Sequence, residues 1–246
     1  MSFIRERIKW ALFPGFNLHA RQRFNELPAL LATGRNGQER LVLDAGCGNG
    51  MLSYASYRLG DRVIAISIKE GEIARNMRMF NEFMGISPDR IDFRLHNLYD
   101  VQKLGLQFDS IICTEVMEHI TDDAGLCRRF WQILKPGGML HITTPNADHP
   151  DNQNEKIDAD EGGGHVRAGY TFATLRSVLL PIGFRIEQEM GLGGPVRQAC
   201  NKRIIALEER FGIVAAAGLF AATWPLPWLD GKPRVPYCIY VRAVKG

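Results

Sequence analysis

The chain of 246 residues lacks several features that would assign it to a protein class at once. None of its five cysteines forms a Cys-x-x-Cys pair, and most fall in apolar segments, so we expect buried free thiols in a reducing compartment. A dense Lys/Arg block is missing as well. With a net charge of only +3 and a pI of about 8.6, the sequence gives no strong case for a nucleic-acid partner.

The chain also has little that suggests export or membrane insertion. Met1–Leu12 mixes charged and apolar residues and has no uninterrupted apolar core, which argues against a secretory signal. The longest uncharged run, Gly212–Leu229, contains Pro225 and Pro227 and falls short of the ~20 residues of a spanning helix. With 46% hydrophobic and 23% charged residues and no internal repeat, we expect one cytoplasmic globular domain.

The most informative segment present is Leu41–Gly50, which reads Leu-Val-Leu-Asp-Ala-Gly-Cys-Gly-Asn-Gly. A short apolar run ends in a carboxylate, three alternate glycines follow, and a helical pattern resumes at Met51. Glycines let the backbone turn sharply and approach a ligand closely. The following helix offers free N–H groups to an anion, so this turn predicts a small-molecule site.

The glycine spacing also argues against a dinucleotide. The NAD fingerprint is G-x-G-x-x-G with an acid roughly 20 residues later. Here the spacing is G-x-G-x-G, Asp44 precedes the glycines, and the second strand ends in Ser67 rather than in an acid.

Apolar runs alternate with helical patterns along the chain, which predicts an α/β fold with a doubly wound, mostly parallel, Rossmann-like sheet. We expect seven strands, at Arg40–Leu43, Arg62–Ile66, Ile91–Leu95, Phe108–Cys113, Gly138–Thr143, Arg185–Glu189 and Tyr237–Ala243, the last one antiparallel. We expect crossover helices at Met51–Leu59, Lys69–Met84, Asp122–Leu134 and Phe172–Pro181.

Within this single domain, residues 1–39 are predicted to form an N-terminal helical cap and residues 40–190 the core. Residues 191–235 form an insertion with a helix at Arg197–Phe211, and residues 236–246 hold the last strand. Residues 145–167 form a long polar loop, and loops of this length inside a domain are usually functional or disordered. We expect the cap and the insertion to cover the substrate side of the sheet.

Asp-x-Gly-x-Gly-x-Gly after an apolar strand resembles motif I of the class I S-adenosylmethionine (SAM) methyltransferases. The Leu-Lys-Pro-Gly-Gly phrase from Leu134 resembles the same family's turn before its fifth strand. The resemblance implies a SAM site at the carboxyl ends of the strands. The residues it implies are Asp44, Gly46, Cys47, Gly48, Ser67, Ile68, Asn97, Leu98 and Thr114. Ser67 departs from the acid that usually holds the SAM ribose.

A second cluster follows the fourth strand, in the order Thr114-Glu115-Val-Met-Glu118-His119. If Glu115 opens a helical turn, Glu118 and His119 share its face at i+3 and i+4. Two carboxylates and an imidazole beside a methyl donor suit a divalent cation, and His165 is the candidate for a further ligand. His149, next to acidic residues, is better explained as a solvated loop residue.

Glu-x-x-Glu-His with a later His resembles two families. They are the UbiG-like ubiquinone-pathway O-methyltransferases and the terminal-ribose O-methyltransferases of small RNAs. The resemblance implies that Glu115, Glu118, His119 and His165 hold a divalent ion such as Mg²⁺, which would orient the substrate and lower a hydroxyl pKa. Three interpretations stay open: this metal site, a metal-free general base at His119, and a purely structural role.

The acceptor is expected to be a small hydroxylated or lipid-like molecule. Apolar residues among basic ones near the N-terminus, and aromatic residues in the insertion, fit either a peripheral membrane contact or a lid packed on the domain. Candidate substrate contacts are Arg21, Arg23, Arg167, Tyr170 and Arg197.

The sequence thus predicts a SAM-dependent methyltransferase, with O-methylation as the first hypothesis. N- or C-methylation, RNA ribose methylation and a non-catalytic SAM-binding protein are the alternatives, and the oligomeric state stays open. The missing RNA-binding region and the low net charge speak against RNA.

Overall fold

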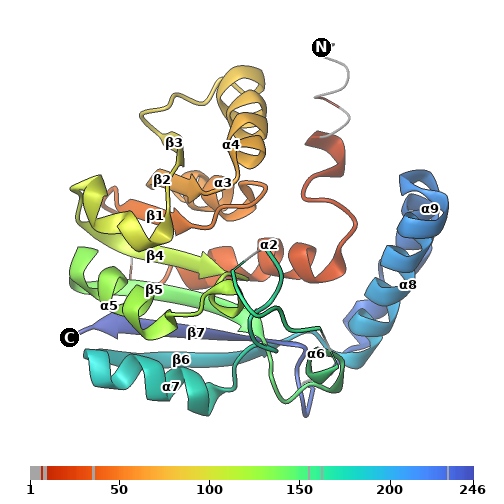
Figure 1. The fold of residues 1–246 in the computed structure, drawn as a ribbon. Coiled ribbons are helices and arrows are strands. Elements are labelled where there is room, and N and C mark those ends of the chain that lie inside the picture. The colour runs from red at the N-terminus through yellow and green to blue at the C-terminus, as the bar shows by residue number, and fades with distance from the viewer. Residues whose placement is uncertain (1–6, 8–9, 35–36, 155, 162, 232) are drawn as a thin grey trace.

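A seven-stranded sheet organises the chain (Figure 1). The computed structural model describes residues 7, 10–34, 37–154, 156–161, 163–231 and 233–246. The strand order is β3-β2-β1-β4-β5-β7-β6, and β7 runs antiparallel to both of its neighbours. The strands are β1 Leu41–Ala45, β2 Arg62–Ser67, β3 Ile91–Leu95, β4 Phe108–Thr114, β5 Leu134–Pro145, β6 Phe184–Leu192 and β7 Cys238–Lys245. The predicted fold class and all seven strands are confirmed.

Helices cover both faces of the sheet because successive strand residues point to opposite sides. Leu43 packs in one core cluster with residues of α5 (Asp123–Ile133) and α7 (Phe172–Leu179). Its neighbour Val42 packs in another with residues of α2 (Leu18–Leu31) and α3 (Met51–Arg58). Both faces are therefore buried, and the apolar runs of the central strands need no polar alternation.

The five strands β1 to β5 are parallel, so their carboxyl ends meet at one edge of the sheet. The register brings Asp44 level with Ala65 on β2 and Ile112 on β4. The segments after β1, β2, β3 and β4 thus gather at this edge, where ligands bind in open α/β sheets.

The helices differ from the predictions at two places before the insertion. The helix predicted over Lys69–Met84 is α4 (Glu70–Asn76) followed by a π-helix, Met77–Phe83. The polar loop after β5 contains a short helix, α6 (Pro150–Gln153). The start of the predicted N-terminal cap, residues 1–6 and 8–9, lies outside the described residues.

The insertion before β7 forms a helical hairpin of α8 (Pro195–Phe211) and α9 (Ile213–Thr223). The sequence predicted α8 within two residues and did not predict α9. The hairpin stands at the margin of the molecule, on the side to which the parallel strands point (Figure 1). It contacts α2, so the N-terminal segment and the insertion lie together. That they cover the substrate side of the sheet stays a prediction. None of the described helices is long and apolar enough to cross a membrane.

Candidate active site

The glycine turn after β1 needs glycine for two separate reasons. Gly46 and Gly50 have φ of +86° and +75°, and a Cβ at either would come within 2.6 Å of Val116 or Phe80. Gly48 has φ of +52°, and a Cβ at this position would have nothing within 4 Å. Gly46 and Gly50 therefore allow close packing, while Gly48 keeps the surface of the turn open to a ligand.

Two adjoining cavities of about 240 and 250 Å³ flank this turn and share Gly46, Gly48 and Glu115 in their linings. The nine residues expected to bind SAM all line them. Besides the shared glycines, the first cavity is lined by Ser67, Ile68, Asn97 and Leu98, and the second by Asp44, Cys47 and Thr114. The structure thus gathers the predicted set, and their contact with a ligand stays a prediction.

Asp44 is buried at the end of β1, where its Oδ2 accepts a hydrogen bond of 2.5 Å from Ser53 Oγ on α3. Burial raises the pKa of Asp44 from 3.8 to about 6, although the Ser53 hydrogen bond works in the opposite direction. A carboxylate held in a buried cavity wall is well suited to receive a cationic ligand group, because the positive charge would compensate for the hydration that the carboxylate loses on burial.

A carboxylate that the sequence pattern did not identify, Glu72, lies beside the end of β2. Ser67 Oγ donates a hydrogen bond of 2.7 Å to Glu72 Oε2 and accepts one from the backbone N–H of Lys69. Glu72 lines the first cavity beside Ser67. The signal was present in the acidic first turn of α4, five residues after the strand end, but the spacing differs from the family pattern.

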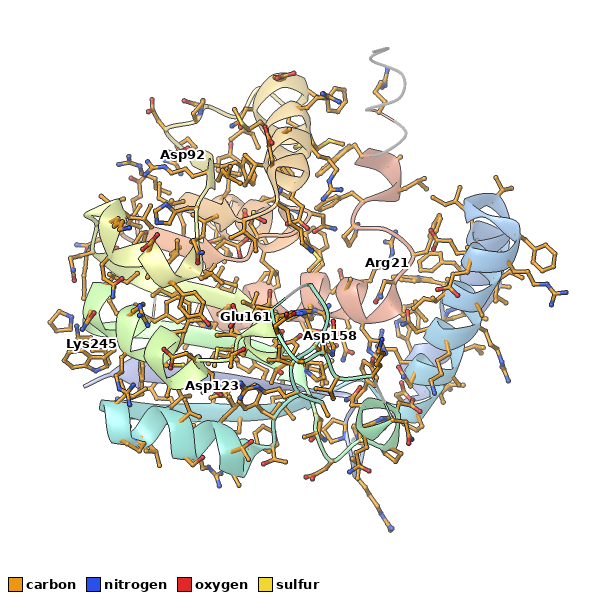
Figure 2. The ribbon with its side chains drawn as sticks, viewed as in Figure 1. Arg21, Asp92, Asp123, Asp158, Glu161 and Lys245 are labelled. Atoms are coloured by element: carbon orange, nitrogen blue, oxygen red, sulfur yellow. The ribbon has the colours of Figure 1, made fainter. Side chains whose placement is uncertain are left out.

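Asn97 follows β3 and caps the 3₁₀ turn Leu98–Leu104, since its Oδ1 accepts a hydrogen bond from the N–H of Tyr99. The Tyr99 hydroxyl donates to Glu161 Oε1 at 2.5 Å, and the N–H of Thr121 donates to the same oxygen at 2.6 Å. Glu161 belongs to the polar loop after β5, beside the carboxyl end of β4 (Figure 2). This loop therefore closes over the first cavity.

Glu115 does not open a helical turn, and this prediction is wrong. Its φ is +53° in the left-handed region, and the turn that follows, Met117–His119, is a 3₁₀ turn. Glu115 Oε2 lies 3.2 Å from Arg23 Nη1, and its Oε1 accepts a hydrogen bond from Thr143 Oγ1. The Glu115 carboxylate is thus held by α2 and β5, and the candidate metal cluster consists of Glu118, His119 and His165.

Three of the four predicted metal ligands do come together. Ligand atoms of Glu118, His119 and His165 lie within 4.8 Å of one another, and the two imidazole rings are 4.6 Å apart. His119 Nδ1 contacts the carbonyl oxygen of Gly164 at 2.8 Å, which fixes the proton on Nδ1 and leaves Nε2 as an acceptor. Burial, and then the charge of Glu115, raise the pKa of Glu118.

His149 and the five candidate substrate contacts lie outside the cluster of Glu118, His119 and His165. His149 contacts Asp151 on α6, outside this cluster. Of the five candidate substrate contacts, Arg23 lines the second cavity. Arg167 and Tyr170 both bind Asp123, Arg21 binds the carbonyl oxygens of Leu12 and Gly15, and Arg197 binds that of Leu18.

Sequence comparison identifies the family of the domain. A family model described as a methyltransferase domain matches residues 17–189. The ubiquinone biosynthesis O-methyltransferase of Xanthomonas axonopodis pv. citri (strain 306) is 36% identical over 107 residues. That match covers 43% of this chain and 43% of the relative, so the chain spans less than half of the length of the curated relatives it matches.

Solved structures share the fold at low identity. The N-methyltransferase NodS from Bradyrhizobium japonicum WM9, in complex with S-adenosyl-L-homocysteine, has a TM-score of 0.59 and 16% identity, covering 99% of this chain and 96% of its own. Magnesium protoporphyrin IX methyltransferase (ChlM) from Synechocystis PCC 6803, with bound SAM, has a TM-score of 0.57 and 18% identity, covering 92% and 80%. With its motif, sheet order and family match, the chain belongs to the methyltransferase domain family, among the class I SAM-dependent methyltransferases.

Proposed function

We propose that this protein transfers the methyl group of SAM to a hydroxyl oxygen of a small, hydroxylated or lipid-like molecule, with the help of a divalent cation. The observation that carries the proposal is the cluster of Glu118, His119 and His165 directly beside the cofactor cavity, whose lining includes His119. A site that holds both the methyl donor and a cation suits a substrate with neighbouring oxygens.

The two cavities fit the two halves of SAM. Ile68 and Leu98 offer apolar contacts for the adenine ring, and Glu72, presented by Ser67, offers its carboxylate to the ribose hydroxyls. In the second cavity, Asp44 would receive the amino group of the methionine half, and Arg23 its carboxylate. The Arg23–Glu115 ion pair holds both charged groups ready at the boundary between the cavities.

The three clustered residues fit a divalent cation. Glu118 is buried, and its Oε2 accepts a hydrogen bond from Thr144 Oγ1 that is long, at 3.4 Å, so this oxygen has capacity for a stronger partner. His119 keeps its Nε2 lone pair for a ligand because Nδ1 bonds Gly164. One carboxylate and two imidazoles would leave positions open for substrate oxygens.

When bound, the cation would lower the pKa of the substrate hydroxyl and so make its oxygen a better nucleophile. The chain's own residues do the rest. The glycine turn holds the donor with its backbone, and the loop that carries Glu161 and His165 shields the first cavity from water. Glu118 and the two histidines fix the acceptor side relative to Glu115, where the two cavities meet.

The relatives support the proposed methyl transfer, although the sequence match to the Xanthomonas protein covers only 43% of this chain. The matched Xanthomonas protein is described as an O-methyltransferase, whereas NodS is an N-methyltransferase on the same fold. The acceptor atom therefore rests on the Glu118–His119–His165 cluster and not on the fold. Five buried free thiols support a reducing, cytoplasmic setting for the reaction.

The test is production of S-adenosylhomocysteine from SAM with a panel of phenols, catechols, amines and lipid extracts. The enzyme is first treated with EDTA and then assayed with and without Mg²⁺ or Mn²⁺. We expect turnover with a catechol or another neighbouring-oxygen acceptor, loss of turnover after EDTA, and recovery with the ion. Turnover on amines alone would contradict the O-acceptor, and the absence of SAM binding would contradict the donor.

A metal-free reaction is the second candidate, and one observation favours it. His119 lines the cavity, and the Gly164 contact leaves Nε2 free to take a proton from an acceptor. In that case turnover survives EDTA but is lost in His119→Gln, while His165→Gln stays active. The metal mechanism instead expects both substitutions to remove turnover.

A further inference from the structure

The exposed outer face of α9, the second helix of the α8–α9 hairpin, is apolar although it faces solvent. Val214, Gly218, Ala221 and Ala222 are exposed and follow the i, i+4, i+7, i+8 spacing of one helical stripe. The chain has no charged residue from 212 to 229. A solvent-facing helix stripe in a globular protein is usually charged or polar, so the composition of α9 does not fit water as its only neighbour.

Larger apolar side chains extend this stripe at both ends of α9. Phe211, Ile213 and Val214 are 62%, 53% and 83% exposed at the turn between the helices. Trp228 and Leu229, just beyond the other end, are 76% and 75% exposed. Exposed apolar side chains therefore occur along α9 and just beyond both of its ends.

The opposite face of α9 already has its partners. Ala216 is fully buried in a cluster with Phe16 and Ile204, and Phe220 packs against it. The Arg21 guanidinium lies 4.7 Å from the centre of the Phe220 ring, between the N-terminal segment and the hairpin (Figure 2). Packing on the domain therefore accounts for the inner face and leaves the outer face unexplained.

We propose that this outer face docks on the surface of an anionic lipid bilayer. An 11-residue helix is about 16 Å long, so the stripe on α9 by itself covers on the order of 200 Å², far below the ~800 Å² per partner of a stable protein interface. A bilayer takes up an apolar helix face without a matching surface. Trp228 at the end of the stripe is of the residue type that favours the lipid–water boundary.

Charge points to the same partner. Residues 195–235 contain six Lys/Arg and three Asp/Glu, an excess of three positive charges that equals the net +3 of the whole chain. Exposed Arg203, Arg210 and Arg234 flank the uncharged run, which fits the attraction of basic residues to anionic lipid headgroups. The docked hairpin would also lie near the cofactor site, since Asn49 of the glycine turn binds the carbonyl oxygen of Pro14 in the adjoining N-terminal segment.

Vesicle flotation of the full chain tests this proposal. Phosphatidylcholine vesicles with and without phosphatidylglycerol are compared at low and high salt, using the wild type and the double variant Val214→Glu/Trp228→Glu. We expect the wild type to float with the anionic vesicles at low salt. The double variant should lose at least about tenfold in partition coefficient, the scale of losing a buried apolar side chain.

Leu180→Glu is the matched control, because Leu180 is 51% exposed on the 3₁₀ turn after α7, away from the hairpin. It should float as the wild type does, and all variants should keep the wild-type melting temperature and SAM affinity. Wild-type protein that stays with the soluble fraction in every vesicle, or a double variant that floats equally well, overturns the proposal. A dimer in light scattering that the double variant dissolves, without flotation, would assign the face to a second copy instead. Flotation needs no methyl transfer, so this outcome is independent of the proposed reaction.

Discussion

Asp44 is a buried carboxylate whose position disfavours its own charge. Burial raises its pKa from 3.8 to about 6, so the folded protein binds this proton more tightly than the unfolded chain does. The stabilising effect of the proton is present at acidic pH and is lost as the pH rises from about 4 to about 6. Above that range the ionised group costs stability, on the order of 3 kcal/mol, which a cationic ligand group would offset.

Asp44→Asn is therefore expected to stabilise the free protein and to weaken SAM binding. The asparagine carbonyl can still accept the Ser53 hydrogen bond but carries no charge to desolvate. We expect a free energy of unfolding up to about 3 kcal/mol higher than wild type near pH 8, with no gain below about pH 4. The Kd for SAM should rise at least about tenfold.

Urea unfolding across this pH range and calorimetric titration with SAM measure the two effects. Asp92→Asn, at a half-exposed carboxylate on β3 outside both cavities, is the control and should change neither quantity by much. A loss of stability in Asp44→Asn at neutral pH would contradict the assigned cost of the buried charge.

Glu72 is expected to hold the ribose in place of the residue that directly follows β2. Glu72→Gln removes the carboxylate that lines the first cavity, so SAM affinity should fall about tenfold, as for a lost charge-assisted hydrogen bond. Ser67→Ala should cost less, because it only frees the Glu72 side chain that Ser67 orients. Glu70→Gln, an exposed acid in the same helical turn, is the matched control. If Glu70→Gln weakens binding as much as Glu72→Gln does, the ribose assignment is wrong.

Glu118→Gln separates metal binding from folding. Burial and the Glu115 charge raise the pKa of Glu118, so a neutral amide of the same shape should be tolerated in the metal-free protein. Affinity for Mn²⁺, measured by paramagnetic resonance, should fall at least about a hundredfold, since the carboxylate in the cluster is gone. SAM affinity and melting temperature should stay near wild type. Glu208→Gln, at an exposed acid on α8, controls for a general loss of charge.

At the scale of elements, the sequence predicted the sheet well because its signals are local. Apolar runs followed by glycine or polar turns locate β1 to β4, and the glycine spacing locates the cofactor turn. The bend at Glu115 could not be predicted in this way. A φ of +53° at a non-glycine residue persists only where the surrounding structure holds it, and Glu115 pairs with Arg23 on α2, 92 positions earlier in the chain.

The difference between local sequence signals and long-range contacts also explains the other features that the sequence did not predict. The π-helix after α4 contains Phe80, which lies close to Gly50, and no local sequence pattern indicates this long-range contact. Glu72 was missed because a carboxylate one helical turn beyond β2 replaces the expected one at the strand end. Helix α9 was missed because its run of Ala, Gly and apolar residues has no amphipathic period, and its two faces differ only in the structure.

Gly50→Ala tests whether the glycine turn is required by packing. Gly50 has φ of +75° and a Cβ there would lie 2.6 Å from Phe80, so we expect a loss of about 2 kcal/mol or more in unfolding free energy. Gly71→Ala in α4 is the matched control, because nothing lies within 4 Å of the Cβ position at Gly71. It should stabilise the protein by about 0.5–1 kcal/mol through helix propensity. Equal effects of the two substitutions in thermal unfolding would contradict this account.

At the scale of the whole molecule, one loop joins the two halves of the site. Glu161 lines the cofactor cavity and binds Tyr99 and Thr121, while His165, four residues later, lies in the proposed cation cluster. The Val166 N–H also binds the carbonyl oxygen of Glu118. SAM bound next to Glu161 would therefore also fix the position of His165, and a cation bound at His165 would also fix the position of Glu161.

Binding of SAM and of the cation should consequently be cooperative, and thermodynamic linkage requires the coupling to be reciprocal. We expect Mn²⁺ to raise SAM affinity about fivefold or more, and SAM to raise Mn²⁺ affinity by the same factor. Tyr99→Phe removes the 2.5 Å hydrogen bond to Glu161, so it should reduce this factor while leaving Mn²⁺ affinity without SAM nearly unchanged. Tyr57→Phe on α3, outside both cavity linings, should keep the full coupling. Equal coupling in both variants would show that the loop does not connect the two sites through Glu161.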